Sequence, residues 1–134
     1  MFSHVTVGVS DLSRSAEFYD ALLTPLGLTR RLVKPDGGPA SVCWHRAGAG
    51  LPRFYAYLPY DGRPSSSGNG GMVAFLASSI DAVKSSYASA MARGGVDEGA
   101  PGPRPQYGPD YFGAYLRDPD GNKVHIVHRS ETAQ

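Results

Sequence analysis

The sequence has little cysteine, no long apolar run and no excess of charge of either sign. Cys43 is the single cysteine among 134 residues, which excludes an intrachain disulfide framework and a cysteine-based zinc knuckle. No apolar run approaches the roughly 18 residues that a membrane-spanning helix needs, so we expect no membrane insertion. Thirteen Lys and Arg residues oppose twelve Asp and Glu residues, and the basic residues form no run, so nucleic-acid binding is not expected.

The first residues alternate like a strand and lack the charged and apolar regions of a signal peptide. Together with the single cysteine, this predicts a cytoplasmic protein. Hydrophobic residues make up 41% of the chain, which is enough for a real core. Seventeen glycines and eleven prolines predict many short elements joined by turns. The length predicts one domain over residues 1–134.

An internal repeat organises the chain. Residues 2–9 alternate like a strand, and apolar residues at helical spacing predict a helix over 12–23. The same order returns after residue 72, and an offset of 68 positions aligns Tyr19 with Tyr87 and His4 with Met72. Three further strands are expected in each half, at 28–34, 41–46 and 54–59, and then at 96–98, 111–117 and 123–128.

The repeat predicts an α+β fold of two βαβββ modules. Module 1 covers about 2–60 and module 2 about 72–129, and the Gly- and Ser-rich residues 61–71 form a linker. Neither half can cover its own sheet alone, so the two halves should share one core. Asp118-Pro119-Asp120-Gly121-Asn122 separates the last two strands and is a strong hairpin turn signal.

Four segments together resemble the vicinal oxygen chelate superfamily, which includes glyoxalase I, bleomycin-resistance proteins and extradiol dioxygenases. They are the stretch from His4 to Leu12, Glu17-Phe18-Tyr19, the strand that starts at Met72, and Arg117 to Val124 with its Asp-Pro-Asp-Gly-Asn turn. The resemblance covers about residues 2–129. It implies a cupped mixed sheet with the helices on its outer face, a small-molecule ligand in the cup, and commonly a homodimer.

The resemblance also implies where a metal would bind. Members with a metal place four ligands at matched strand positions, which fall here on His4, on Tyr55 or Tyr57, on Met72 and on His125. No carboxylate stands at any of these positions, and a thioether is a poor ligand for a catalytic divalent ion. Two alternatives remain open: no cofactor, or a divalent metal such as zinc, nickel or iron held by His4 and His125.

His4 and His125 are the candidate catalytic residues. His4 lies on the strand face opposite Val5 and Val7, and His125 lies between two aliphatic residues on the opposite face from them. Each is a metal ligand or a general base in the functional interpretation, and a hydrogen-bonded strand histidine in the structural one. The two imidazoles are expected to converge across the cup.

Aromatic residues and one arginine are the candidate substrate-binding residues. Phenols in an apolar wall suit small ligands, although ordinary sheet packing explains the same spacing. Arg104 lies in a Pro-rich loop and is either a carboxylate or phosphate clamp or a solvated side chain. The predicted set is Tyr55, Tyr57, Met72, Arg104, Tyr107 and Tyr111. Cys43 is expected to be a buried, inert thiol.

Several functions therefore compete. A metal-dependent lyase or isomerase similar to lactoylglutathione lyase, and a dioxygenase, both need a carboxylate that the implied ligand positions lack. The interpretation that we favour is a small-molecule-binding protein without the usual metal quartet, which either sequesters its ligand or transforms it with His and Tyr alone. A purely structural role is the remaining alternative.

Overall fold

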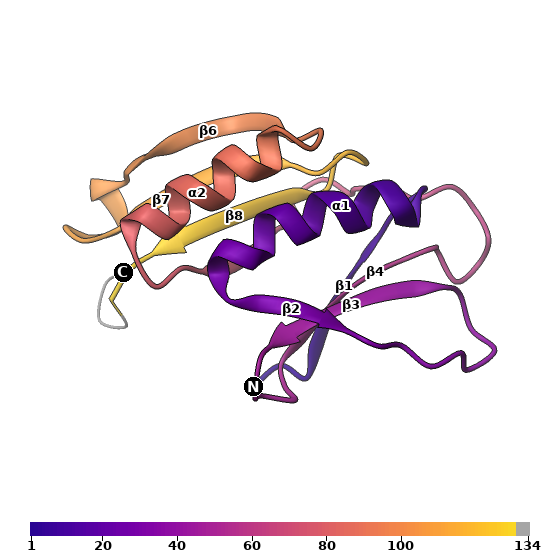
Figure 1. The fold of residues 1–134 in the computed structure, drawn as a ribbon. Helices are drawn as coiled ribbons and strands as arrows, with labels where there is room; N and C mark the ends of the chain where they lie inside the picture. Colours follow the sequence, from indigo (N-terminus) through magenta and orange to yellow (C-terminus); the bar gives the residue numbers. More distant parts are fainter. Residues whose placement is uncertain (131–134) are drawn as a thin grey trace.

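The computed structural model describes residues 1–130. The predicted α+β fold of two βαβββ modules is confirmed, and Figure 1 shows its arrangement. In chain order the elements are β1 (His4–Gly8), α1 (Leu12–Leu23), η1 (Thr24–Leu26), β2 (Leu28–Arg31), β3 (Ser41–Arg46), β4 (Arg53–Tyr57), β5 (Val73–Leu76), α2 (Ile80–Met91), β6 (Val96–Pro103), η2 (Pro105–Tyr107), β7 (Phe112–Arg117) and β8 (Lys123–His128). Neither α1 nor α2 is long and apolar enough to cross a membrane.

Each module forms its own four-stranded mixed sheet. The strand order is β1-β4-β3-β2 in the first, which we call sheet 1, and β5-β8-β7-β6 in the second, sheet 2. The first strand of each module pairs in parallel with the last strand, and the other pairs are antiparallel. The repeat in the sequence is therefore a repeat of topology.

Both helices begin at a residue whose side chain accepts a backbone N–H from the first turn. Asp11 accepts from Arg14 and Ser79 accepts from Ala82, which satisfies one of the free amides at each helix start. The stripe Phe18, Leu22 and Leu23 of α1 is fully buried. This apolar face packs into the core, whereas Ser13, Arg14 and Glu17 on the other side of α1 are exposed.

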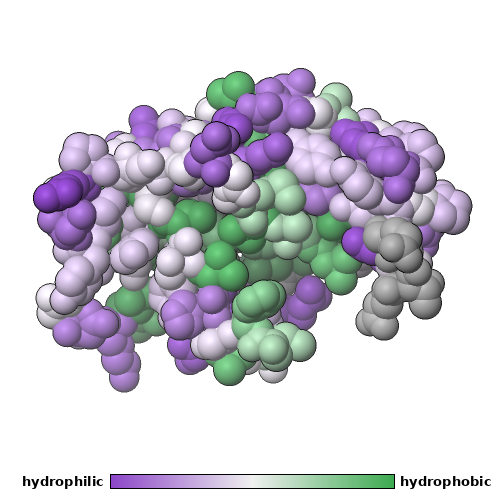
Figure 2. Space-filling view, turned by 180° about the vertical axis from the view of Figure 1, so that it is seen from behind, coloured by the Kyte–Doolittle hydropathy of each residue, from purple (hydrophilic) through white to green (hydrophobic). Residues whose placement is uncertain are grey.

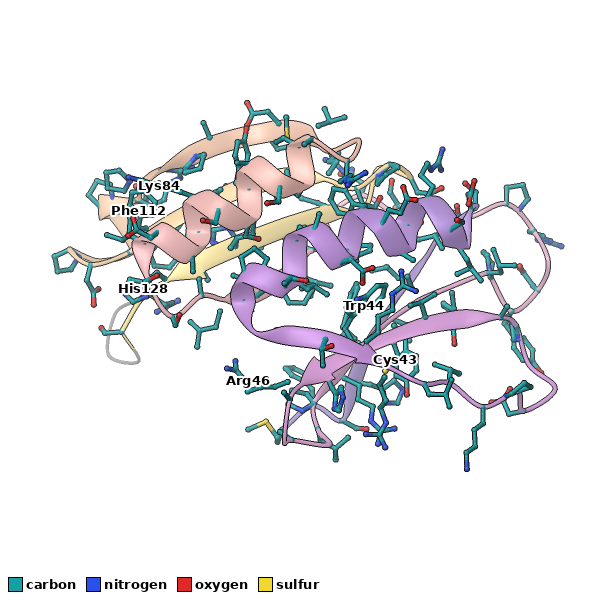
Figure 3. The ribbon with its side chains drawn as sticks, viewed as in Figure 1. Cys43, Trp44, Arg46, Lys84, Phe112 and His128 are labelled. Carbon is teal, nitrogen blue, oxygen red and sulfur yellow. The ribbon has the colours of Figure 1, made fainter. Side chains whose placement is uncertain are left out.

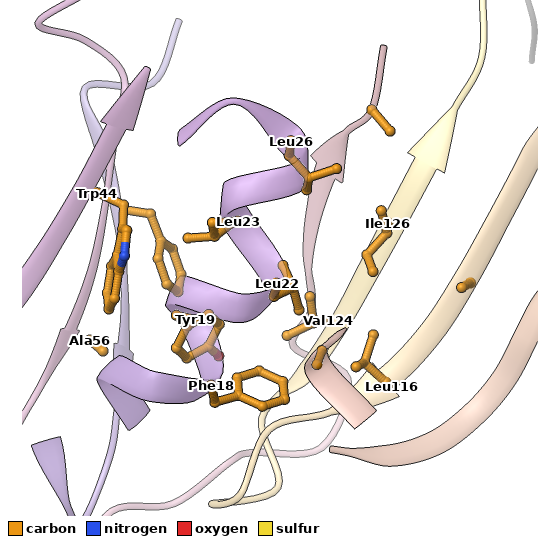
Figure 4. Packing of buried hydrophobic residues seen from close by; sticks show 14 of the residues in the cluster. Phe18, Tyr19, Leu22, Leu23, Leu26, Trp44, Ala56, Leu116, Val124 and Ile126 are labelled. Atoms are coloured by element: carbon orange, nitrogen blue, oxygen red, sulfur yellow. The ribbon is translucent and has the colours of Figure 1, made fainter. Parts of the chain in front are cut away.

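The core lies between the two sheets, with α1 in the middle of it. Figure 4 shows Trp44 and Ala56 of sheet 1 on one side of α1, and Leu116, Val124 and Ile126 of sheet 2 on the other. Where α1 does not intervene, the sheets meet directly, since the ring centroids of Phe54 on β4 and Phe75 on β5 are 5.1 Å apart. One buried cluster joins both modules.

The outward faces of the two sheets consequently point in different directions. Strand side chains alternate between faces, so Trp44 points to α1 while its neighbour Cys43 points away from it, as Figure 3 shows. The same alternation puts His4 and Tyr55 on the outward face of sheet 1. On sheet 2 it puts Tyr115 and His125 on the outward face.

The turn at 118–122 joins module 2 to module 1. Asp118 is 1% exposed, and its Oδ2 accepts hydrogen bonds from the Tyr19 hydroxyl (2.7 Å) and from Asn122 Nδ2 (2.8 Å). Asn122 Nδ2 also donates to the carbonyl oxygen of Gly8, and Asp120 accepts from the amide and hydroxyl of Ser10. The turn that carries the family resemblance is therefore a structural joint.

Strand β6 is longer than the sequence predicts. We expected residues 96–98, whereas the strand runs over Val96–Pro103. Two register shifts between Asp97 and Gly102 interrupt its pairing with β7. Prolines are tolerated there because β6 is an edge strand, and the Gly and Pro residues concealed it in the sequence.

Candidate functional site

The larger candidate site is a hollow of about 880 Å³ over the outward face of sheet 1, which we call hollow 1. His4 and Thr6 of β1, Tyr55 and Tyr57 of β4, and the segment from Arg31 to Asp36 are among its lining residues. The His4 and Tyr55 rings meet edge to face, with centroids 5.6 Å apart. The His4 Nδ1 lies 3.0 Å from the Ser3 hydroxyl, and the side chain is exposed.

A smaller hollow of about 560 Å³ lies over the outward face of sheet 2, and we call it hollow 2. Residues 68–71, which the composition predicts to be a flexible linker, form one wall. Met72, Arg104, Tyr107, Tyr115 and Lys123 line it as well. The Lys123 Nζ lies 5.3 Å from the centroid of the Tyr115 ring.

His125 lies beneath hollow 2 and is 2% exposed. Its Nδ1 lies 2.8 Å from the carbonyl oxygen of Ala114, which only accepts, so Nδ1 carries the proton. The Nε2, 2.8 Å from the Tyr111 hydroxyl, is then the acceptor of that O–H. Burial lowers the pKa of His125, which keeps the ring neutral.

The His125 ring also belongs to a column of stacked aromatic rings. Tyr115 stacks on it with centroids 4.0 Å apart and planes at 8°, and Tyr111 stacks at 5.9 Å and 16°. Gly113 makes room for the imidazole, because a Cβ at this position would lie 2.6 Å from His125 Cε1. These contacts fix the outward face of sheet 2 as a rigid aromatic wall.

The predicted site residues thus fall into two groups. His4, Tyr55 and Tyr57 line hollow 1, whereas Met72, Arg104 and Tyr107 line hollow 2 with Tyr111 and His125 behind them. Within one chain, His4 and His125 lie on sheet faces that point away from the shared core. Their convergence in one site stays a prediction that a second copy of the chain would have to satisfy.

The residues at the implied ligand positions do not fit a divalent metal. Both ring nitrogens of His125 are engaged in hydrogen bonds within the protein. Over residues 1–130, no group of three or more His, Cys, Asp or Glu side chains is arranged to hold an ion. The other implied ligand positions hold His4, Met72 and a phenol, so none of them supplies the carboxylate that such an ion prefers.

Sequence reasoning missed the cations of hollow 1. Arg53 lies beside His4 on the neighbouring strand, and its Nε donates to the carbonyl oxygen of Gly50 at 2.8 Å. Arg31 pairs across the sheet with Cys43. The alternation that put Tyr55 and Tyr57 on one face puts Arg53 there too, so the signal was in the sequence.

Cys43 lies on the floor of hollow 1 between these arginines. Burial raises the pKa of its thiol, while a hydrogen bond from Tyr55 and the positive charges of Arg53 and Arg31 act in the opposite direction. The thiol is free and buried, as the sequence predicts.

Residues 1–126 match the model of the Glyoxalase/Bleomycin resistance protein/Dioxygenase superfamily. The chain belongs to this superfamily. No curated protein matches the chain.

Solved structures give the same result. A glyoxalase/bleomycin resistance protein from Albidiferax ferrireducens T118 is 39% identical with a TM-score of 0.81, covering 97% of this chain and 99% of that one. A glyoxalase-related enzyme from Fulvimarina pelagi is 20% identical (TM-score 0.70; 96% and 88% covered). TnmS3, an antibiotic binding protein from Streptomyces sp. CB03234, is 21% identical (TM-score 0.63; 97% and 96% covered). The last two share the fold alone.

Proposed function

We propose that this superfamily member binds a small organic molecule without a divalent metal, in sites that hollow 1 of one chain and hollow 2 of a second copy build together. The observation that carries this proposal is the state of His125. Its imidazole is neutral, buried and hydrogen-bonded at both nitrogens, so it serves as part of a wall. The aromatic and polar lining of both hollows suits a small ligand.

The shared site follows from the direction of the sheet faces. In each sheet, the face that packs against the helices is buried in the common core. The two outward faces therefore cannot face each other within one chain. Strands β1 and β5 are edge strands whose outer sides carry no strand partner over residues 1–130. Figure 2 shows apolar side chains gathered in the middle of the face opposite the viewpoint of Figure 1, which suits a covered surface. A homodimer pairing β1 with β5 of the other copy would build two equivalent cups.

A complementation experiment tests the shared site. Tyr55→Ala removes a wall of hollow 1, and Tyr107→Ala removes a wall of hollow 2. Either variant alone damages both cups of a homodimer. A co-expressed heterodimer of the two has one intact cup and one doubly altered cup. Using the neutral fluorescent probe N-phenyl-1-naphthylamine, we expect weak binding to each homodimer and half the wild-type number of tight sites in the heterodimer.

Two further outcomes decide the proposal. Heterodimers that regain no tight site, or a protein that is monomeric in analytical ultracentrifugation, would overturn the shared site. Elemental analysis of freshly purified protein is expected to find no stoichiometric transition metal. A stoichiometric metal that is lost in His4→Ala and kept in Ser3→Ala would instead support a metal-dependent lyase.

A further inference from the structure

Positive charge is concentrated in the two hollows. Three cations and one carboxylate line hollow 1, namely Arg31, Lys34, Arg53 and Asp36. Three cations and one carboxylate also line hollow 2, namely Arg104, Arg117, Lys123 and Glu98. The whole chain carries a formal charge of +1, so the rest of it is net negative. A cup built from both hollows gathers six of the thirteen Lys and Arg side chains around one cavity.

Ion pairs do not neutralise this charge in hollow 1. The described ion pairs of residues 1–130 are those of Arg14, Arg30 and Arg117, and none of these residues lines hollow 1. The one carboxylate of hollow 1, Asp36, accepts the amide of Gly38 at 2.8 Å. Arg31, Lys34 and Arg53 therefore have no carboxylate partner within the described part of the chain.

The cations of hollow 1 flank the ring of Tyr55. Arg31, Cys43, Tyr55 and Thr6 form one row across four strands. Arg53 precedes Tyr55 by two residues on the same face of β4, and its Nη1 lies 3.5 Å from the Tyr55 hydroxyl. Its bond to Gly50 fixes the guanidinium on one side, and its Nη2 has no hydrogen-bond partner among residues 1–130. This geometry offers N–H donors next to a ring face.

We propose that the ligand is a small organic anion, with a flat aromatic body on Tyr55 and a carboxylate, phosphate or sulfonate held by Arg53, Arg31 and Lys34. The inference rests on the proposed function, because it names the ligand class of the same cup. Hollow 2 supplies the opposite wall, where Tyr115 offers a ring face and Lys123 a further positive charge. Arg104 contributes charge only, since its guanidinium donates to the carbonyl oxygens of Ala100, Gly102 and Pro103.

A matched pair of probes tests the inference. 8-Anilino-1-naphthalenesulfonate is an aromatic anion, and N-phenyl-1-naphthylamine has the same ring skeleton without the sulfonate. Fluorescence titration of the wild-type protein should give at least about tenfold tighter binding of the anion. The double variant Arg31→Gln/Lys34→Gln should weaken anion binding about tenfold and change neutral-probe binding less than about twofold. Both side chains are exposed, so this variant keeps the fold.

Two further variants complete the test. Arg53→Gln should weaken anion binding by a similar factor, whereas Arg63→Gln, an exposed cation that lines neither hollow, should change nothing. Equal affinity of the two probes, or equal loss of both in the double variant, would overturn the anion inference and leave the proposed function intact. Failure of both probes to bind the folded dimer would overturn both.

Discussion

The two modules share one topology, but their outward faces differ in construction. Sheet 1 presents half-exposed tyrosines and cations that form no ion pair with residues 1–130. Sheet 2 fills the equivalent face with stacked rings of Tyr115, His125 and Tyr111. In the site that we propose, the first face recognises the ligand and the second forms the wall behind it. Substitutions in each of the two modules test this difference.

The largest effect is expected at the glycines of the two outward faces. In Gly113→Ala the new Cβ would clash with the His125 ring at 2.6 Å and would lie 3.1 Å from the Ile126 carbonyl oxygen. We expect the free energy of unfolding to fall by about 3 kcal/mol. In Gly8→Ala the new Cβ meets its nearest atom at an ordinary 3.6 Å, so the cost should stay below about 1 kcal/mol. Urea denaturation followed by circular dichroism measures both, and equal losses would contradict the packed-wall interpretation.

The repeat-related tyrosines should give the next largest difference. Tyr19→Phe leaves a buried oxygen of Asp118 with one donor fewer, so we expect a loss of about 2 kcal/mol in unfolding free energy. Tyr87→Phe removes a bond to the exposed Asp97 and should cost about 0.5 kcal/mol or less. The same denaturation experiment compares the two variants. A larger loss in Tyr87→Phe would refute the proposed importance of the buried joint.

The smallest effect concerns pH and the two predicted catalytic histidines. The pKa of His125 is lower in the folded protein than its value near 6.5 in the unfolded chain. At a pH between these two values, the unfolded chain binds a proton that the folded protein does not bind. Stability should therefore fall as pH decreases below about 6.5, by at most about 1.4 kcal/mol per pH unit. His125→Gln should lose this part of the slope and His4→Gln should keep it. Unfolding free energies between pH 7 and 5 provide the measurement, and an unchanged slope in His125→Gln would exclude this source.

Much of the fold could be read from local patterns. Apolar spacing predicted the helix over 12–23, the repeat predicted its counterpart, and the Asp-Pro-Asp-Gly-Asn turn predicted the last hairpin. These features depend on neighbours in the chain. Most of strand β6 was not predicted, because it forms through pairing with β7 and its Gly and Pro residues are not typical of a strand.

The site was harder to predict for a physical reason. The alternation of strand side chains predicted which sheet face His4 and His125 occupy. Tyr55 lines hollow 1 and Arg104 lines hollow 2. Alternation cannot tell whether an imidazole on that face points to solvent or lies under a tyrosine ring. That difference is set by Gly113 on the neighbouring strand and by the carbonyl oxygen of Ala114. Long-range packing therefore decided the chemistry of His125.

The joint at residues 118–122 bears on how the chain reaches its native state. Tyr19, Gly8 and Ser10 all find their hydrogen-bonding partners more than 90 positions further along the chain. During synthesis from the amino terminus, the first module must wait for almost the whole polypeptide to leave the ribosome before these groups are satisfied. Contacts between such distant positions slow the search for the native topology. We therefore expect the two halves to fold as one cooperative unit, because their hydrogen bonds and their core are shared.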